Sequence, residues 1–309
     1  MVIRSPAAGD FEAVLAVLQA CDRDVYDDTD WTEQELREQW DEIDLATDAW
    51  VAVEDETVVG VMHLCERRGD TFIGDGYVVP HARGRGIGSS LVRALEARVD
   101  AVLAQAPPSG RPVVHLAHLV GDETAPTLLA QEGFGHARSF FRMMIDLPPA
   151  LPAAVWPDGL ELRPFDPLRD GRAVYETDVL AFRDEWGYRA QPYDVWHERL
   201  FVTPRVDPTL PVVAWAGERV AGMALNYPKR MGDWGWISVL GVHPDWRRRG
   251  LGLALLHESF ARFRASGETT VALGVDAANP TGATRLYERA GMRVLWQADV
   301  WEKEVQPGG

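Results

Sequence analysis

Residues 247–252 read Arg-Arg-Arg-Gly-Leu-Gly and stand between an expected strand, 236–242, and an expected helix, 253–266. Glycines at such a point let the backbone turn tightly and approach a ligand without side-chain collision. The first amides of a helix are unpaired, and the helix dipole adds partial positive charge there. Because three guanidinium groups come with them, the segment predicts an anion site, and a diphosphate is the natural ligand.

Two other phosphate-binding motifs fit this segment poorly. A dinucleotide-binding fingerprint ends the first strand of its domain and is followed by an acidic residue on a second parallel strand. Here the glycines come after a hairpin, in the middle of a domain, and no acidic residue follows at that distance. The Gly-Lys-Ser/Thr signature of a phosphate loop is absent from the sequence.

The same pattern occurs twice in the chain. Pro80–Gly88 recurs as Pro244–Gly252, displaced by 164 residues, and the surrounding pattern of strands and helices recurs with it. The expected strands, helices and hairpins of the two copies are 72–79 and 236–242, 89–104 and 253–266, 113–119 and 270–275, and 49–64 and 211–226. A short helix, stopped by Gly133 or Gly291, and two closing strands are expected to complete each copy. The prediction is an α/β chain with an N-terminal domain, 1–147, a proline-rich linker, 148–157, and a C-terminal domain, 158–309.

A second motif identifies the family. Residues 279–292 read Asn-Pro-Thr-Gly-Ala-Thr-Arg-Leu-Tyr-Glu-Arg-Ala-Gly-Met, one helix and one strand after Gly250. The two motifs together resemble the pyrophosphate loop and the later CoA-contacting helix of the GNAT superfamily of acyl-CoA-dependent N-acyltransferases. The two-copy layout is similar to that of the mycothiol synthases, a tandem branch. The resemblance implies two tandem GNAT-like domains, each a mixed, mostly antiparallel sheet with splayed parallel central strands flanked by helices.

The resemblance also implies a site and a co-substrate. Acetyl-CoA is the usual acyl donor, and it would lie between the strands 236–242 and 270–275. The residues implied to bind it are Leu240, Val242, Arg247, Arg248, Arg249, Gly250, Leu251, Gly252 and Asn279. A backbone N–H near Leu240 or Gly241 would serve the oxyanion. Tyr287 matches the position of the family's general acid, which protonates the departing thiolate; the alternative for it is a half-buried helix aromatic.

The general base is not evident from the motif. Many relatives carry a glutamate early in the strand before the pyrophosphate loop, whereas residues 234–238 here contain no carboxylate. This departure argues against the acceptor of the mycothiol synthases. Glu185 is the substitute that we expect to act in catalysis. Asp184 and Asp276 are two further candidates, and a helix cap or a surface charge is the alternative for all three.

The N-terminal copy has weaker motifs. Val78, Arg83, Gly86 and Gly88 preserve the anion-binding turn. At the tyrosine position, however, stands Leu129, which cannot donate a proton, and Gly121 stands at the asparagine position. The N-terminal domain is therefore expected to be able to hold CoA without being the main catalytic centre.

Composition limits the partners. A net charge of −16 argues against nucleic acid, no apolar run reaches membrane-spanning length, no secretory signal opens the chain, and the two cysteines suit the cytoplasm. No metal-ligand spacing occurs, and no oligomeric state follows from the sequence. Residues 21–50 contain twelve Asp or Glu and two Arg. This acidic segment is either a solvated face or a docking site for a basic partner.

Three functions are compatible with the sequence. The first is N-acetylation of a small-molecule amine, and a cationic one is favoured because Trp186, Trp196, Trp234 and Trp236 fall in segments expected to surround an acceptor. Core packing is the alternative for each tryptophan. The second function is the same chemistry on a peptide or protein. The third is a CoA-binding or scaffold protein whose catalytic sites have decayed.

Overall fold

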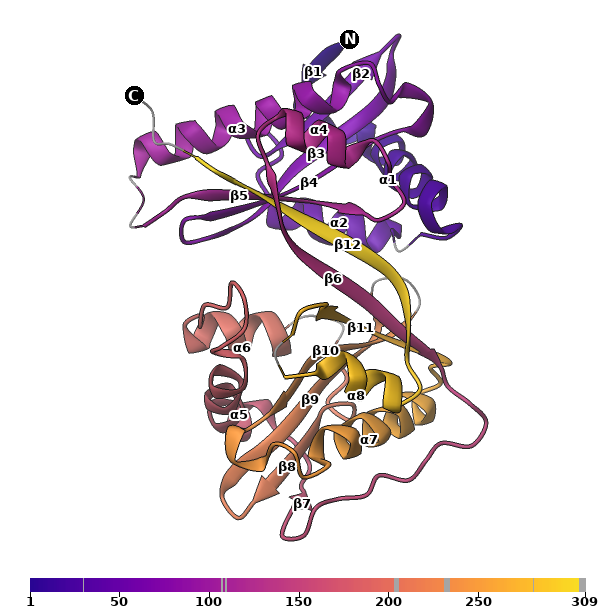
Figure 1. Ribbon diagram of the computed structural model, residues 1–309, viewed down its shortest axis with the longest axis vertical. Helices are drawn as coiled ribbons and strands as arrows, with labels where there is room; N and C mark the ends of the chain where they lie inside the picture. Colours follow the sequence, from indigo (N-terminus) through magenta and orange to yellow (C-terminus); the bar gives the residue numbers. More distant parts are fainter. Residues whose placement is uncertain are drawn as a thin grey trace. The chain divides into compact units, whose positions relative to one another are not determined.

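The computed structural model describes residues 1–29, 31–106, 108, 110–202, 206–230, 234–279 and 281–305. Asp30 of the acidic stretch and Pro280 of the second motif lie outside these residues. The chain forms two compact units: unit 1 contains Met1–Phe140 and Trp296–Gly309, and unit 2 contains Phe141–Leu295. Figure 1 shows the elements of both.

The elements follow one another in the same order in both copies. Those of the first copy are β1 (Val2–Arg4), α1 (Phe11–Tyr26), α2 (Glu33–Glu42), β2 (Ala49–Glu54), β3 (Thr57–Arg68), β4 (Thr71–Val78), α3 (Ile87–Gln105), β5 (Val113–Leu119), α4 (Ala125–Gln131) and β6 (Gly135–Asp146). Those of the second are β7 (Glu161–Leu162), α5 (Pro167–Phe182), α6 (Tyr193–Phe201), β8 (Val212–Ala216), β9 (Arg219–Arg230), β10 (Trp234–Val242), α7 (Leu251–Ala265), β11 (Thr270–Asp276), α8 (Ala283–Arg289) and β12 (Arg293–Glu304). Between the copies, residues 148–157 form neither helix nor strand.

Each unit is built on a mixed sheet. The strand order is β1-β2-β3-β4-β5-β12 in unit 1, and in unit 2 it runs from the end of β6 through β11, β10, β9 and β8 to β7. The pairs β4–β5 and β10–β11 are parallel, and the other pairs whose registers are known are antiparallel. The predicted mixed sheet with a central parallel pair is therefore confirmed.

The closing strands differ from the prediction. Each copy ends in one strand of twelve residues, β6 or β12, where two strands were expected. Neither segment has an internal Gly or Pro that would turn the chain back. Both strands cross between the units: β6 ends in unit 2, where Met143 and Ile145 join its core, and Trp301 of β12 packs on the core of unit 1. The units thus divide inside β6 and β12, rather than at 147 and 158.

The long helices bury the apolar positions that the sequence pattern indicated. In α7, Leu255, Leu256, Phe260 and Phe263 are all fully buried. In unit 2, α5 and α7 cover opposite faces of the sheet (Figure 1). A Cβ on Gly222 of β9 would meet α7, whereas Met223, the next residue, packs in the same core as residues of α5. The sheet is therefore held between two helical layers, and its edges and strand ends stay available for a site.

Candidate active site

The two central strands of unit 2 separate along their length. β10 and β11 pair only at Gly235 with Val271 and at Trp236 with Ala272, although β10 runs to Val242 and β11 to Asp276. From Ile237 onward the described part of β10 pairs with β9 alone, and a register shift between Ile237 and Val239 marks a bulge. At Leu240 and Val242, the edge of β10 on the side of β11 therefore has no strand partner, and this is the edge where acyl-CoA is predicted to bind.

A tight turn links β10 to α7. Arg248 adopts a φ of 62°, and Gly250, the N-cap of α7, has a φ of 86°. The first hydrogen bonds of the helix run from the amides of Leu253 and Ala254 to the Gly250 carbonyl. The amides before Leu253 precede this ladder, as is usual at a helix start. A Cβ on Gly250 would meet no atom within 4 Å, so this glycine is required by its φ and by what approaches it.

The next glycine has a packing role. A Cβ on Gly252 would lie 2.8 Å from Cδ2 of Leu286 in α8. The equivalent Gly88 stands in the same relation to Leu128 of α4. In both units this glycine lets the short helix that carries the tyrosine or leucine position approach the long helix. Its contribution to an anion site was expected from the motif; its contact with the short helix was not.

The three arginines of the turn are placed differently. Arg247 is half-buried, and its guanidinium donates to the carbonyl oxygens of Val242, at 3.3 Å, and Ala181, at 2.9 Å. It therefore ties the end of β10 to the end of α5. Arg248 and Arg249 are exposed, and the Arg249 guanidinium lies 4.8 Å from the ring centroid of Trp246. Neither Arg248 nor Arg249 is enclosed by protein, so both stay candidates for the predicted phosphate contact.

Tyr287, Glu185 and Asn279 converge beside the ends of β10 and β11. Asn279 donates from Nδ2 to Oε1 of Glu185 at 2.9 Å, and its own Oδ1 accepts from the amide of Thr281. The Tyr287 ring is buried, with an exposed fraction of 7%. Burial and the charge of Glu185 raise the pKa of Tyr287 well above its ordinary value. Burial, with the charge of Asp276, also raises the pKa of Glu185. The structure thus joins Asn279 to Glu185 by a hydrogen bond and places Tyr287 within the electrostatic influence of Glu185.

The other two carboxylates proposed as bases have ordinary structural partners. Asp184 is exposed and pairs with Arg183 at 3.6 Å. Oδ1 of Asp276 accepts from the amide of Ala278 at 2.8 Å, at the turn after β11. Asn279 forms hydrogen bonds with Glu185 and with its own turn, and its contact with the acyl-CoA arm stays a prediction. The hydrogen bond from Asn279 holds the Glu185 carboxylate in its observed orientation.

Asp178 of α5 was missed in the sequence. It is buried, and it accepts a hydrogen bond from Nε1 of Trp196 at 3.1 Å. Burial raises the pKa of Asp178 to about 6, and Glu185 acts in the same direction. A signal was available: Asp22 of α1 stands at the same place, four residues before the last residue of its helix, and it too is buried.

The four tryptophans have different surroundings. Trp196 belongs to the core of unit 2. The guanidinium carbon of Arg142 lies over Trp236, 4.8 Å from the centroid of the tryptophan ring. Trp234 is half-buried, and Trp186 has an exposed fraction of 37%. Core packing therefore accounts for Trp196, while Trp186 is open to solvent next to Glu185.

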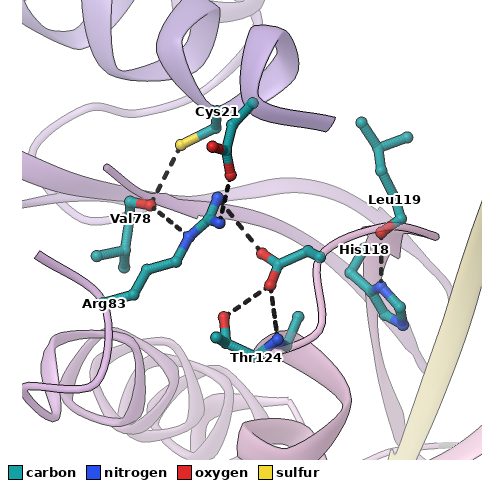
Figure 2. A network of polar contacts seen from close by, with 9 residues as sticks. Cys21, Val78, Arg83, His118, Leu119 and Thr124 are labelled. Carbon is teal, nitrogen blue, oxygen red and sulfur yellow. Dashed lines mark hydrogen bonds and ion pairs between the residues drawn. The ribbon is translucent and has the colours of Figure 1, made fainter. Parts of the chain in front are cut away.

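In unit 1 the corresponding arginine is enclosed by acids (Figure 2). Arg83 donates from Nε to the Val78 carbonyl at 3.3 Å and from Nη1 to Asp24 at 2.7 Å, and Nη2 lies 3.5 Å from Asp122. Cys21 shares the Val78 carbonyl, and burial raises the pKa of its thiol to about 11. Both carboxylates compensate the guanidinium charge, so little of it is left for an anion.

The short helix of unit 1 departs from the prediction by one residue. Asp122, not Gly121, makes the contacts that Asn279 makes within its own turn in unit 2: its Oδ1 accepts from the amide and the hydroxyl of Thr124, as Oδ1 of Asn279 accepts from Thr281. The loop before α4 is one residue shorter than the loop before α8, which shifts the alignment. Leu129 is buried at the tyrosine position, with an exposed fraction of 4%.

In the part of the chain that the structure describes, no helix is both long and apolar enough to cross a membrane. Nor do three or more His, Cys, Asp or Glu side chains of the described residues gather in a way that could hold a metal ion.

Comparison with known proteins agrees with this geometry. The mycothiol acetyltransferase of Thermobispora bispora is 34% identical over 239 residues, covering 74% of either chain, and that of Actinosynnema mirum is 31% identical over 259 residues, covering 80% of either. A GCN5-related N-acetyltransferase from Sphaerobacter thermophilus superposes with a TM-score of 0.88 at 32% identity, over 100% of this chain and 96% of that one. A tandem GNAT protein of the clavulanic acid biosynthesis pathway, 20% identical, shares the fold with a TM-score of 0.72, over 100% of this chain and 99% of that one. The model of the acetyltransferase (GNAT) family matches residues 11–106 and 172–292. The chain therefore belongs to the GNAT family and is an acetyl-CoA-dependent N-acetyltransferase.

Proposed function

We propose that this enzyme acetylates a small, cationic primary amine in unit 2, with Glu185 accepting the amine proton and Tyr287 acting as general acid. The observation that carries the proposal is the convergence of Glu185, Asn279 and Tyr287 beside the separated ends of β10 and β11. A carboxylate and a phenol at one point supply the two proton transfers that amine attack on a thioester needs.

The charge of Glu185 couples these two transfers. An alkylammonium has a pKa of about 10 and must lose a proton before it attacks. The raised pKa of Glu185 makes its carboxylate a stronger base for that proton. Once protonated, Glu185 no longer contributes the charge that raises the pKa of Tyr287. The phenol thus becomes more acidic when the thiolate, with a reference pKa of about 8.5, leaves.

Acidic side chains near this point favour a cationic acceptor. The negative charges of Asp276 and Asp178 both interact with Glu185, and these interactions raise the pKa of Glu185 and of Asp178. An ammonium group placed among them would relieve this repulsion. The relatives named mycothiol acetyltransferases support a small-molecule acceptor, the coarse class that we adopt here.

Unit 2, rather than unit 1, is proposed as the main catalytic centre. In unit 1, Arg83 is paired with two aspartates, and Arg85 lies 3.1 Å from Glu54. In unit 2, Arg247 donates to carbonyl oxygens, and Arg248 and Arg249 are exposed. The turn of unit 2 therefore keeps more positive charge for a diphosphate.

A thiol-release assay with acetyl-CoA tests the proposal. The acceptor panel contains amino sugars, amino acids, polyamines and aminoglycosides, with a basic peptide as a separate arm. We expect turnover with one class of small amine and a hundredfold or greater loss in Glu185→Gln and Tyr287→Phe. Turnover of the peptide alone would favour the protein-acetylating alternative. Acetyl-CoA binding without turnover of any acceptor would favour the decayed scaffold.

A further inference from the structure

Glu185 lies in a loop rather than on a helix or a strand. Residues 183–192 link α5 to α6 and contain neither kind of element. The Glu185 amide donates to the Phe182 carbonyl at 2.8 Å, and the Tyr188 amide donates to the Glu185 carbonyl at 3.2 Å. Both bonds join near neighbours, so they shape a turn without fixing it on the rest of unit 2. Because loops are more mobile than the elements that they connect, side chains must hold a catalytic group that a loop carries.

Asp178 contacts both this loop and α6. It stands near the end of α5, and its side chain is buried. Oδ2 of Asp178 accepts from Nε1 of Trp196 on α6 at 3.1 Å, and this hydrogen bond is buried as well. The hydroxyl of Tyr188 interacts with the same carboxylate, and so does the charge of Glu185. Asp178 is therefore a common contact for the loop and the helix that follows it.

Further contacts place the loop against the two helices. The rings of Phe182 and Tyr188 stack with their centroids 6.3 Å apart and an angle of 29° between their planes. The hydroxyl of Tyr175 on α5 donates to the Gln191 carbonyl at 2.6 Å. Trp196 belongs to the core of unit 2. The carboxylate thus has a rigid neighbour on one side and the loop on the other.

A buried carboxylate is a costly way to fill this space. An apolar side chain would give up little hydration there, whereas Asp178 loses its water when the chain folds. Burial accordingly raises the pKa of Asp178 to about 6. A carboxylate has two acceptor oxygens and can serve groups from two elements at once. Here those groups come from α6 and from the loop, so the cost of burial is offset by the orientation of the segment that carries Glu185.

We propose that Asp178 is a positioning residue for the acetyl transfer. Through Trp196 and Tyr188 it holds the loop, so that the Glu185 carboxylate stays at its hydrogen bond with Asn279. The inference rests on the proposed function of Glu185 as the base. Asp178 acts through the loop and exchanges no proton with the amine.

The first test is hydrogen exchange of the full chain, followed by mass spectrometry of the peptides that contain residues 183–192. Asp178→Leu removes the carboxylate, and Trp196→Phe removes one of its donors while an aromatic ring is kept. We expect exchange of the loop amides to become about tenfold faster in both variants. Asp178→Asn keeps an oxygen for Trp196, so its loop exchange should stay within about threefold of the parent.

Thr177→Val is the matched control for this test. The Thr177 hydroxyl is buried one residue before Asp178 and donates to the Ala173 carbonyl of its own helix at 3.0 Å, so its loss should leave exchange in the loop unchanged. The inference is overturned if Trp196→Phe leaves loop exchange at the parent's rate, or if Thr177→Val accelerates it as much. Should Asp178→Leu not fold, Trp196→Phe decides the question.

The second test is a double-mutant cycle in thiol release from acetyl-CoA, with the amino sugars, amino acids, polyamines and aminoglycosides of the acceptor panel. Trp196→Phe should lower kcat/KM about tenfold in the parent and by less than about twofold in Glu185→Gln, because a base that is absent cannot be misplaced. An equal loss in both backgrounds would show a general loss of structure and would overturn the inference. If Glu185→Gln has the kcat/KM of the parent, the proposed base is wrong, and the exchange result alone decides whether Asp178 holds the loop.

Discussion

Replacement of Tyr287 by Phe isolates the proton donor from the packing. The ring contributes to the core of unit 2 and is retained, whereas the hydroxyl forms no hydrogen bond with any described residue. The free energy of unfolding should therefore change by less than about 1 kcal/mol. General acid catalysis contributes about 10²–10⁴ in rate, so kcat should fall by that factor, which corresponds to about 2.7–5.4 kcal/mol in activation free energy.

The assay is steady-state thiol release at saturating acceptor, with acetyl-CoA affinity measured separately by calorimetry. Affinity should stay within about twofold because Tyr287 is not expected to bind the ground state. Tyr227→Phe is the matched control: its buried hydroxyl donates to the Leu200 carbonyl at 2.7 Å, so its loss should cost about 1–3 kcal/mol of stability and leave kcat intact. If kcat of Tyr287→Phe stays within threefold of the parent, the phenol is not the acid.

Three further predictions concern single side chains. Glu185→Gln should lower kcat/KM and abolish the fall of kcat/KM at acid pH, because the parent enzyme loses its base as the pH falls through the raised pKa of Glu185. An unchanged pH profile of kcat/KM would exclude Glu185 as the base. Gly250→Glu directs a carboxylate into the turn from a position with no atom within 4 Å, and it should abolish turnover and the binding of acetyl-CoA to unit 2. The matched Gly86→Glu in unit 1 should spare turnover, and the reverse result would exchange the roles of the units. The pKa of Asp178 is about 6 in the folded protein and about 3.9 in the unfolded chain. Between these pH values the folded protein keeps a proton that the unfolded chain loses, so the free energy of unfolding falls as the pH rises from about 4 to about 6. In urea unfolding at pH 4.5 and pH 7, Asp178→Asn should show a smaller fall in the free energy of unfolding than the parent.

Elements with strong periodicity could be predicted from the sequence, and the division of the chain could not. The expected strand 113–119 coincides with β5, and the expected helix 253–266 differs from α7 by two residues at its start and one at its end. The two closing strands carry the same local pattern in both copies. Nothing in that pattern decides which sheet each joins, because that choice depends on long-range packing of residues such as Met143 and Trp301.

The site divides in the same way. The geometry of a turn depends on a few neighbouring residues, so the turn at Gly250 and the start of α7 could be predicted from the motif. The bond between Asn279 and Glu185 joins residues 94 positions apart, and no spacing rule reveals it. In the sequence, Asp178 is one polar residue in an amphipathic helix. Only the structure shows that it is buried and that burial raises its pKa.

The acids that pair with arginines in unit 1 lead to a final prediction. In the background of Gly250→Glu, where binding to unit 2 is blocked, the double change Asp24→Asn and Glu54→Gln releases Arg83 and Arg85 from their partners. Asp122 is kept, because it accepts from amides at the start of α4. Exposed pairs are worth about 0.2–1 kcal/mol each, so CoA affinity should rise by about 2- to 30-fold in calorimetric titration. Removing two exposed charges elsewhere, by Glu33→Gln and Asp41→Asn, should leave affinity unchanged. Equal affinities in all three proteins would show that charge compensation does not distinguish the turns, and that the difference between the copies lies in the leucine alone.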